Sequence, residues 1–393
     1  LDANTTASNN TAVGKSALTA NTTGASNVAV GSSALAANTT GGSNTALGQA
    51  SLISLTTASY NTAAGLNSGL LLTTGADNTL IGVSAGTTLT TGTLNVAVGR
   101  NALAGGQATN RNVAIGNNTL QSVSAPSSVD AYNVAIGYNS GGSVTTGVQN
   151  TLMGGLAGDA ITTASNNTAV GYASLGANTT GTNNVAVGAE ALDAIVSDND
   201  CTAIGYRSLS ANTASSNTAL GSEALQFNTS GNSNVGIGVQ ALRANTTASI
   251  NTAVGFNAGA TNTTGNLTAF GGYAAQAQTT ATNTTALGSF SLYANTTGAN
   301  NTAVGSAFGA TRGVLQDNTT GANNTAMGVA ALSANTTASY NTAVGTSALF
   351  ANTTGAENTA VGTNALKLST TGANNVAVGV NALFENTTAS NNT

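Results

Sequence analysis

The sequence predicts an all-β protein, a parallel β-solenoid with about 23 coils of a 17-residue repeat. A glycine recurs every 17 residues at the end of a short β-prone run, and β-branched residues within that run favour a strand. A glycine in every period would also break a long helix. Because one repeat cannot bury its own apolar face, neighbouring coils must stack and share a core. We therefore expect residues 1–393 to form a single repeat solenoid.

The repeat reads Asn-Thr-Ala-Val-Gly-x-x-Ala-Leu-x-Ala-Asn-Thr-Thr-Gly-x-x, and its positions are numbered here from 1 to 17, starting at the first Asn. It occurs in 22 copies, with its position-5 glycines running from Gly14 to Gly379. The spacing departs from 17 at two one-residue deletions, before Gly221 and Gly271, and at two insertions, near 117–133 and 306–324.

The first element of each coil is a short strand at positions 2–4. Position 2 is mostly Thr or Val, position 4 is mainly Val, Leu, Ile or Met, and position 3 is nearly always Ala. Side chains alternate along a strand, so we expect positions 2 and 4 to point into the core and Ala to face another layer or subunit. The invariant glycine at position 5 indicates a positive φ or a close backbone approach.

The second element carries the other apolar anchor, at position 9. This position is Leu in 15 copies and Ala275 in one, and it is glycine in six: Gly69, Gly86, Gly141, Gly158, Gly259 and Gly309. Position 12 is usually apolar where position 9 is glycine, as in Leu72, Leu89, Val144 and Ile161. We infer two coil variants that fill the same core space from different backbone positions. Gly259 with Asn262 and Leu52 with Leu55 break this rule.

The remainder of the coil is less determined by the sequence. Positions 6–11 are compatible with a second short strand or with one helical turn, and positions 13–15 carry turn residues. We expect positions 6, 7, 10, 16 and 17 to point outward.

The composition excludes several classes of function. The chain has no His, one Cys, seven Lys or Arg and twelve Asp or Glu. These counts exclude a His-based catalytic or metal site and an intrachain disulfide, and they disfavour a basic nucleic-acid surface. We expect no enzyme, no metal and no cofactor; carboxylate chemistry at Asp193, Asp198 and Asp200 is the remaining alternative.

Neither end of the chain matches the end of a repeat. Leu1 occupies position 9 and Thr393 occupies position 2, without an initiator Met, a signal peptide or a capping repeat. We expect a window of a longer chain. No run approaches the ~18 apolar residues of a membrane span, so none is expected here.

The segments NNTAVGKSAL (9–18), SNVAVGSSAL (26–35) and NNVAVGVNAL (374–383) resemble the head repeats of trimeric autotransporter adhesins. The fuller form, NTAVGxxALxANTTG, is similar to the repeat shafts of bacterial and phage-type tail-fibre-domain proteins. The resemblance covers essentially the whole chain. It implies a left-handed parallel β-roll, often trimeric, on a cell or virion surface.

Positions 12–14 form twelve acceptor sequons for N-glycosylation. The alternative is a ladder of asparagine amides bonded between coils. The sequon asparagines are Asn4, Asn21, Asn38, Asn178, Asn228, Asn245, Asn262, Asn295, Asn318, Asn335, Asn352 and Asn386.

Three weaker signals favour ordinary structural roles. Asp198-Asn199-Asp200 resembles a fragment of a calcium loop, and a solvated turn is the simpler interpretation. Cys201 fills position 1 as a small residue rather than a nucleophile. The Tyr and Phe residues, in variable positions, are interpreted as partly buried, with stacking on sugars or a subunit contact as alternatives.

The function expected from these observations is a structural extracellular fibre or shaft that self-assembles by stacking or lateral packing. The alternative is an adhesin or tail-fibre segment that binds surface glycans near the two insertions. A remote alternative is an ice-binding solenoid, because threonine columns run along the repeat.

Overall fold

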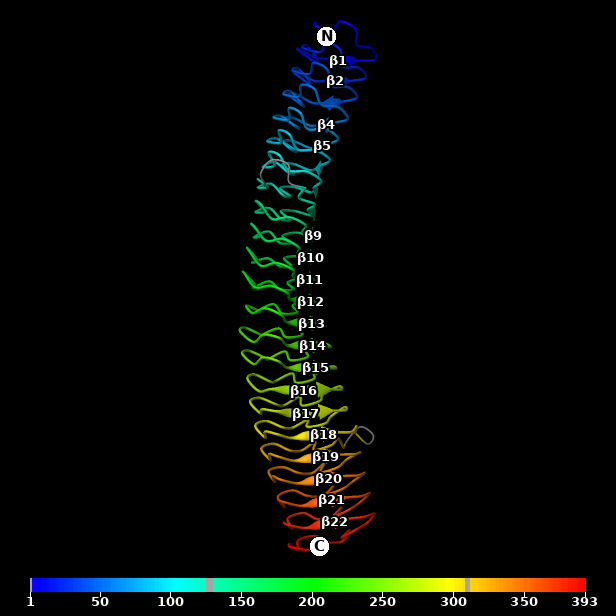
Figure 1. Ribbon diagram of the computed structural model, residues 1–393, viewed down its shortest axis with the longest axis vertical. Coiled ribbons are helices and arrows are strands. Elements are labelled where there is room, and N and C mark those ends of the chain that lie inside the picture. Colours follow the sequence, from blue (N-terminus) through cyan, green and yellow to red (C-terminus); the bar gives the residue numbers. More distant parts are fainter. Residues whose placement is uncertain (1, 125–129, 308–311) are drawn as a thin grey trace. The chain divides into compact units, whose positions relative to one another are not determined.

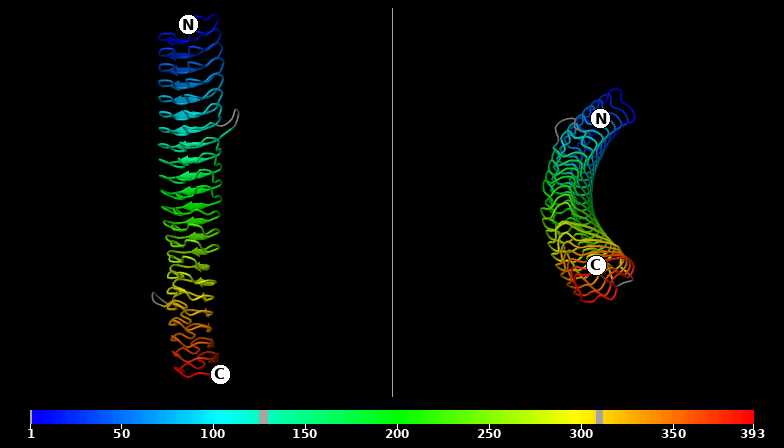
Figure 2. Two further views of the ribbon diagram at one scale, coloured as in Figure 1. Left: turned by 90° about the vertical axis from the view of Figure 1, so that its left-hand side faces the viewer. Right: turned by 60° about the horizontal axis from the view of Figure 1, so that its bottom comes forward.

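A computed structural model describes residues 2–124, 130–307 and 312–393. They form two compact units, residues 1–200 and 201–393, each a stack of coils with eleven strands (Figure 1; further views in Figure 2). No helix occurs in the described part of the chain, which confirms the all-β parallel solenoid.

Each strand spans three or four residues of the NTAVG run. The strands of the first unit are β1 (Thr11–Val13), β2 (Val28–Val30), β3 (Thr45–Leu47), β4 (Thr62–Ala64), β5 (Thr79–Ile81), β6 (Val96–Val98), β7 (Val113–Ile115), β8 (Val134–Ile136), β9 (Thr151–Met153), β10 (Thr168–Val170) and β11 (Val185–Val187). Those of the second unit are β12 (Thr202–Ile204), β13 (Thr218–Leu220), β14 (Val235–Ile237), β15 (Thr252–Val254), β16 (Leu267–Phe270), β17 (Thr284–Leu287), β18 (Thr302–Val304), β19 (Thr325–Met327), β20 (Thr342–Val344), β21 (Thr359–Val361) and β22 (Val376–Val378).

Within each unit, consecutive strands pair in parallel and in register, so that position 3 of one coil lies on position 3 of the next. Ala12 pairs with Ala29, for example. The two insertions leave this register intact, because Val113 still pairs with Val134 and Thr302 with Thr325. The extra residues are therefore accommodated outside the strand ladder.

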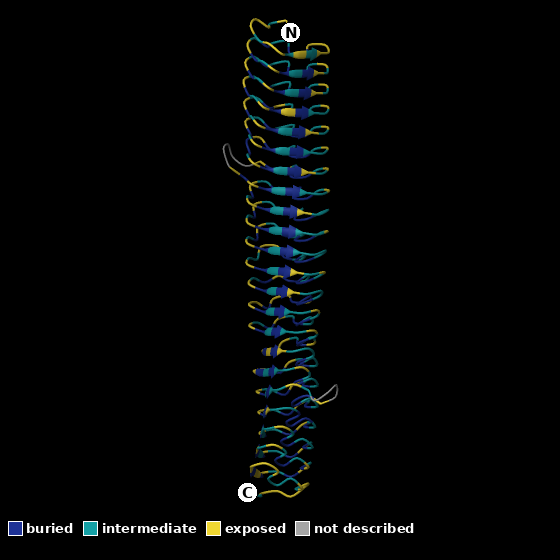
Figure 3. Ribbon diagram, turned by 90° about the vertical axis from the view of Figure 1, so that its right-hand side faces the viewer, coloured by how far each residue is buried: buried dark blue, intermediate teal, exposed yellow. Residues whose placement is uncertain are grey.

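The inward side of the strand is the opposite of the one expected from the sequence. Ala29 and Ala46 are fully buried at position 3, whereas Val30 and Leu47 at position 4 are 37% and 42% exposed. Figure 3 shows this as a buried strand centre between more exposed ends. The expectation that positions 2 and 4 point inward was wrong, because the leucine at position 9 of the same coil fills the core and leaves room only for alanine across from it.

The position-5 glycine has both properties predicted for it. Gly31 has a φ of 138°, and a Cβ on it would lie 2.4 Å from the carbonyl oxygen of Gly48 in the next coil. Any other residue would both strain this backbone and collide with the neighbouring coil.

Position 9 lies in the left-handed region of backbone space. Leu35 has a φ of 53° and is fully buried, and Leu349 has a φ of 50°. This conformation costs an L-residue about 1–2 kcal/mol, so burial of the leucine side chain must offset local strain in each such coil. Glycine at the same position relieves the strain but leaves a hole.

The hole is filled from other positions, as the two-variant prediction requires. A Cβ at Gly86 would lie 2.9 Å from Leu80 Cδ2 and 3.4 Å from Leu89 Cδ1. Leu89 at position 12 was predicted to fill this space, and Leu80 at position 3 of β5 was not. In the exceptional coil, a Cβ at Gly259 would lie 2.5 Å from Leu267 Cδ2, so a leucine at position 1 of the next coil replaces the missing one.

Gly309 lies outside the described residues. After the insertion, the ninth position of that coil is taken by Leu315, which is fully buried with a φ of 49°. Its amide donates to the carbonyl oxygen of Ala331, at 3.0 Å, as position-9 amides do in regular coils.

Positions 6–11 form neither a second strand nor a helical turn. They form consecutive turns whose amides still bond to the next coil: Leu35 N donates to Ser51 O at 3.0 Å and Ala37 N to Ile53 O at 3.1 Å. Side chains at positions 6, 7, 10, 16 and 17 are mostly half-buried or exposed, as predicted.

Candidate functional site

The sequon asparagines lie inside the coils. All are fully buried except Asn4 and Asn386, which belong to the first and last coils of the chain. In a typical coil, Asn38 Nδ2 donates to Asn21 Oδ1 and to Gly41 O, both at 2.9 Å. A glycan on Nδ2 has no space in such a coil, so modification of the ten buried sequons is incompatible with the folded protein.

The structure thus contains the amide ladder that was the alternative interpretation of these asparagines. The ladder is interrupted, for example, after Asn38, where Leu55 follows at position 12, and after Asn352, where Ser369 follows. At these two interruptions the last asparagine Oδ1 is buried without a hydrogen-bond partner. After Asn178, where Ile195 follows, the Oδ1 instead accepts from Gly181 N at 2.9 Å. The ladder contributes to stability through its continuity, because each amide satisfies the next.

A second ladder, at position 1, was missed from the sequence. Asn44 N donates to Asn27 Oδ1 at 2.9 Å, and Asn44 Nδ2 donates to Ala58 O at 2.9 Å. The signal in the sequence is the near-uniform Asn before each strand. Cys201 replaces Asn in this column, where it is fully buried and its Sγ donates to Ala214 O at 3.2 Å.

Threonines at position 13 form a third ladder, in which Thr39 Oγ1 donates to Thr56 O at 3.1 Å and Thr56 Oγ1 to Thr73 O at 3.2 Å. These hydroxyls donate their hydrogen bonds to the protein backbone. They therefore offer little to an ordered array of water.

The side chains at positions 2 and 4 form the outer strand face of each unit. No charged residue occurs at either position in any copy. Position 4 is an almost wholly aliphatic column that is exposed in some coils, as at Ile81 (41%), Leu220 (46%) and Met327 (43%), and half-buried in others, as at Val98 and Ile136. Position 2 adds a neighbouring column that is mostly threonine. A regular, uncharged face with a continuous apolar column is typical of an interaction surface.

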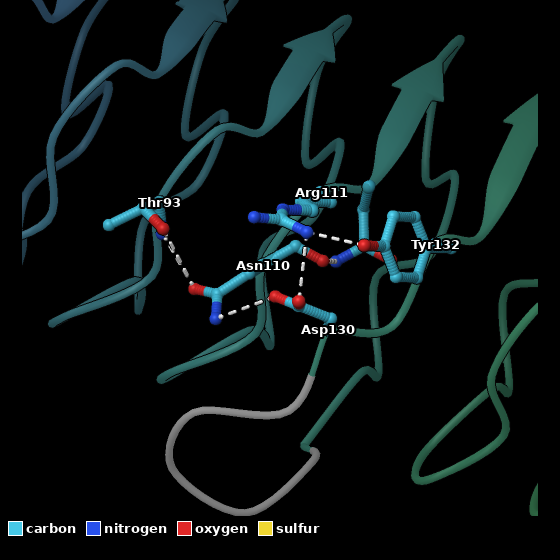
Figure 4. A network of polar contacts seen from close by, with 6 residues as sticks. Thr93, Asn110, Arg111, Asp130 and Tyr132 are labelled. Carbon is cyan, nitrogen blue, oxygen red and sulfur yellow. Dashed lines mark hydrogen bonds and ion pairs between the residues drawn. The ribbon is translucent and has the colours of Figure 1, made fainter.

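At the first insertion, polar side chains bond to one another in what we call the closed network (Figure 4). Arg111 Nη1 lies 2.9 Å from Asp130 Oδ2 and donates to Tyr132 Oη, while its guanidinium lies 5.4 Å from the centre of the Tyr132 ring. The hydrogen bond to Tyr132 and the charge of Asp130 raise the pKa of Arg111. Asn110 Nδ2 donates to Asp130 Oδ1 at 3.4 Å, and Thr93 N donates to Asn110 Oδ1 at 2.9 Å.

At the second insertion, a similar set of residues borders a cavity of about 430 Å³. Arg312 Nη1 lies 3.3 Å from Asp317 Oδ2, and its guanidinium lies 5.2 Å from the centre of the Phe350 ring. Lys367 and Thr346 also line this cavity, which we call the Arg312 pocket. The insertions expected to carry a receptor site thus hold one closed network and one open pocket.

An arginine, a carboxylate and an aromatic ring also meet in a regular coil. Arg243 Nε lies 3.0 Å from Glu223 Oε2, and its guanidinium lies 5.0 Å from the centre of the Phe227 ring. An insertion is therefore not required for such a cluster. The feature that makes Arg312 a candidate is the cavity that it lines.

The segment 198–200 is occupied by contacts between coils. Asn199 Oδ1 accepts from Thr182 N at 2.6 Å, and Asp200 Oδ1 accepts from Asn183 Nδ2 at 3.2 Å. Across residues 2–124, 130–307 and 312–393, no group of three or more His, Cys, Asp or Glu is placed to hold a metal ion. Over the same ranges, no helix is long and apolar enough to cross a membrane.

Aromatic residues are distributed between contacts and solvent. The rings of Tyr273 and Phe290 stack at 4.9 Å, and Phe256 meets Tyr273 edge-on at 5.1 Å. Tyr60 and Tyr340, at position 17, are 66% and 63% exposed. The prediction of partial burial therefore fits the aromatic residues whose rings contact one another, but not the position-17 tyrosines, which are mostly exposed.

No protein-family profile matches the chain, and no curated protein sequence is significantly similar to it. The likeness to adhesin heads and tail-fibre shafts therefore stays a prediction that rests on the repeat motif.

Proposed function

We propose that the protein is a structural shaft of an extracellular fibre, and that copies of it associate laterally through the outer strand face. The observation that carries this proposal is the position-4 column of apolar side chains, which is exposed or half-buried at the surface of every coil in a chain with very few charged residues. The face repeats at every coil, so the surface that matches it along its whole length is a second copy with the same period.

The size of the face fits this partner. Strands ~4.8 Å apart and about 10 Å long give an outer strand face of roughly 500 Å² for each unit's eleven strands. Counted for one unit alone, this area is of the same order as the roughly 800 Å² per partner that a stable protein interface buries. Because the face is uncharged, association should persist at high salt.

The experiment places lysines on the face and compares them with lysines elsewhere on the same coils. Val30→Lys, Leu47→Lys and Ile81→Lys are combined in one variant, and Thr40→Lys, Thr57→Lys and Thr91→Lys, at exposed loop positions ten residues further on, form the matched control. We expect sedimentation velocity to show assemblies for the wild type and the control and monomers for the face variant. Monomeric wild type, or equal loss in both variants, would contradict the proposal.

A binding role is the second candidate, because the Arg312 pocket breaks the uniformity that a pure shaft requires. A shaft that displays a receptor-binding site combines both roles.

A further inference from the structure

The charges around the Arg312 pocket point to an anionic ligand. The whole chain carries seven basic residues and a net charge of −5, yet Arg312 and Lys367 line this one cavity. No carboxylate is among the residues that line it. A hollow with two cations in an otherwise acidic chain concentrates anions from solution.

Arg312 is held in place but retains donors for a ligand. Its side chain is 44% exposed, with one nitrogen, Nη1, 3.3 Å from Asp317 and the guanidinium over the Phe350 ring. A guanidinium has five N–H donors in a planar fork that matches a carboxylate. The contacts with Asp317 and Phe350 therefore orient the fork without using all of its donors.

The remaining lining favours a sugar over a simple anion. Phe350, Val329 and Ala330 give the cavity an apolar wall, and Thr346 and Ser347 add hydroxyl groups beside it. At about 430 Å³ the cavity falls within the ~300–1,000 Å³ of small-molecule sites, far more than a phosphate or a free carboxylate fills. An aromatic wall with hydroxyl partners suits the apolar face and the hydroxyls of a pyranose ring.

The hollow also continues along the coils. Lys367 lines a second, more open depression together with Asn364, Asn381, Phe384 and one carboxylate, that of Glu385. The Lys367 ammonium lies 5.7 Å from the centre of the Phe384 ring. The two depressions share Lys367, so a ligand of more than one sugar unit can follow them.

We propose that the Arg312 pocket binds a uronic-acid residue of an acidic oligosaccharide, with Arg312 and Lys367 on the carboxylate and Phe350 on the sugar ring. This site goes beyond a shaft function and does not depend on self-association.

The test is calorimetric titration of the purified chain with tetragalacturonate, with its uncharged methyl ester and with sodium phosphate. We expect saturable binding of tetragalacturonate that weakens with salt, and little binding of the ester or of phosphate. Arg312→Gln and Lys367→Gln should each weaken binding about 3- to 10-fold, given charge-assisted bonds at a partly exposed site. Phe350→Leu should weaken it for all ligands with a pyranose ring.

Arg111→Gln is the matched control, because Arg111 has the same kinds of partner but lies in the closed network of the first insertion. It should bind tetragalacturonate as the wild type does. The proposal is overturned if the chain does not bind tetragalacturonate, if the ester binds equally well, if phosphate competes at equal concentration, or if Arg111→Gln and Arg312→Gln have equal effects. Repeating the titration on the lysine variant of the outer strand face separates a failure here from a failure of the shaft proposal.

Discussion

The two insertions differ in where they leave the coil, and this difference decides what each one makes. The first follows Val123, at position 12, and returns at Asp130, beside the strand edge, where Arg111, Asp130 and Tyr132 bond to one another. The second lies between Gly305 at position 5 and Val314 before Leu315, so its Arg312 reaches over the turns of later coils. One insertion therefore satisfies its own polar groups, and the other leaves a cavity.

The tenth positions show a related contrast. In the first unit this column includes Asp159 and Asp193, whereas in the second it includes Phe350, Lys367 and Phe384. The same coil geometry thus presents acidic groups in one place and cationic and aromatic groups in another. Function in a solenoid of this type is therefore determined by side chains placed on a constant backbone.

The largest effects should be the same at both insertions, because the core behind them is equivalent. Leu120→Asp and Leu315→Asp each place an unpaired charge at a fully buried position 9 and should destabilise the local coils by about 4 kcal/mol or more. Asn117→Asp, at an exposed position 6, should be nearly silent. Hydrogen exchange of the flanking coils measures this, and equal protection in all three variants would refute the assignment of the core.

The second-largest effect, the loss of stability when the position-5 glycine is replaced by alanine, should differ between the two insertions. A Cβ on Gly116 would lie 2.2 Å from Gly137 O, whereas a Cβ on Gly305 would meet nothing closer than 3.1 Å. Both glycines have a positive φ, 132° and 139°, so both alanine variants carry backbone strain. We expect Gly116→Ala to lower the unfolding temperature more than Gly305→Ala. The reverse order would show that the coils are not looser at the second insertion.

The ion pairs at the two insertions should each contribute little to stability, and only the pair at the second insertion should affect ligand binding. Both pairs are about 42–45% exposed, so Asp130→Asn and Asp317→Asn should each cost less than about 1 kcal/mol. Asp317→Asn should also tighten tetragalacturonate binding by about 2-fold, because it removes the carboxylate that competes for Arg312. Titration of the two variants checks this; tighter binding by Asp130→Asn alone would place the site at the wrong insertion.

The smallest expected effect on stability concerns the acidic residues at position 10 of the first unit, Asp159 and Asp193. Burial, followed by the charges of Glu190 and Asp159, raises the pKa of Asp193 above its ordinary 3.8, so its ionised form is less favourable in the folded protein. This loss of stability is absent below the unfolded pKa and develops as the pH rises through the folded pKa. Asp193→Asn should therefore raise the unfolding temperature at pH 7, on the order of 1 °C, and leave it unchanged at pH 3. A larger gain at pH 3 than at pH 7 would reverse the assigned sign.

Much of the coil could be predicted from one sequence because each feature recurs at a fixed position. The strand, the glycine such as Gly31 and the buried leucine such as Leu35 follow from periodicity and residue type alone. Which face of the strand points into the core could not be predicted in this way. Alternation places positions 2 and 4 on one face and position 3 on the other, but it does not say which face is buried. Only the position of the opposing leucine decides this, and it depends on how the coil closes.

The candidate site was located only in part. The sequence predicted a site near the insertions. It did not predict that Arg312 would lie over the Phe350 ring and share a cavity with Lys367, because both residues come from later coils. Leu80, which fills the space beside Gly86, was missed for a similar reason, since a leucine in an alanine column is informative only once that column is known to face the core.

The central claim is that copies of the chain meet through the outer strand face. Leu47→Cys and Thr57→Cys place one exposed thiol on the same coil, on the face and off it, while the native Cys201 is fully buried and serves as the background. Each variant is treated with a short bis-maleimide at a concentration where the wild type associates, and covalent dimers are counted by mass. We expect dimers from Leu47→Cys and only background levels from Thr57→Cys. Equal yields, or dimers from Thr57→Cys alone, would contradict association through this face.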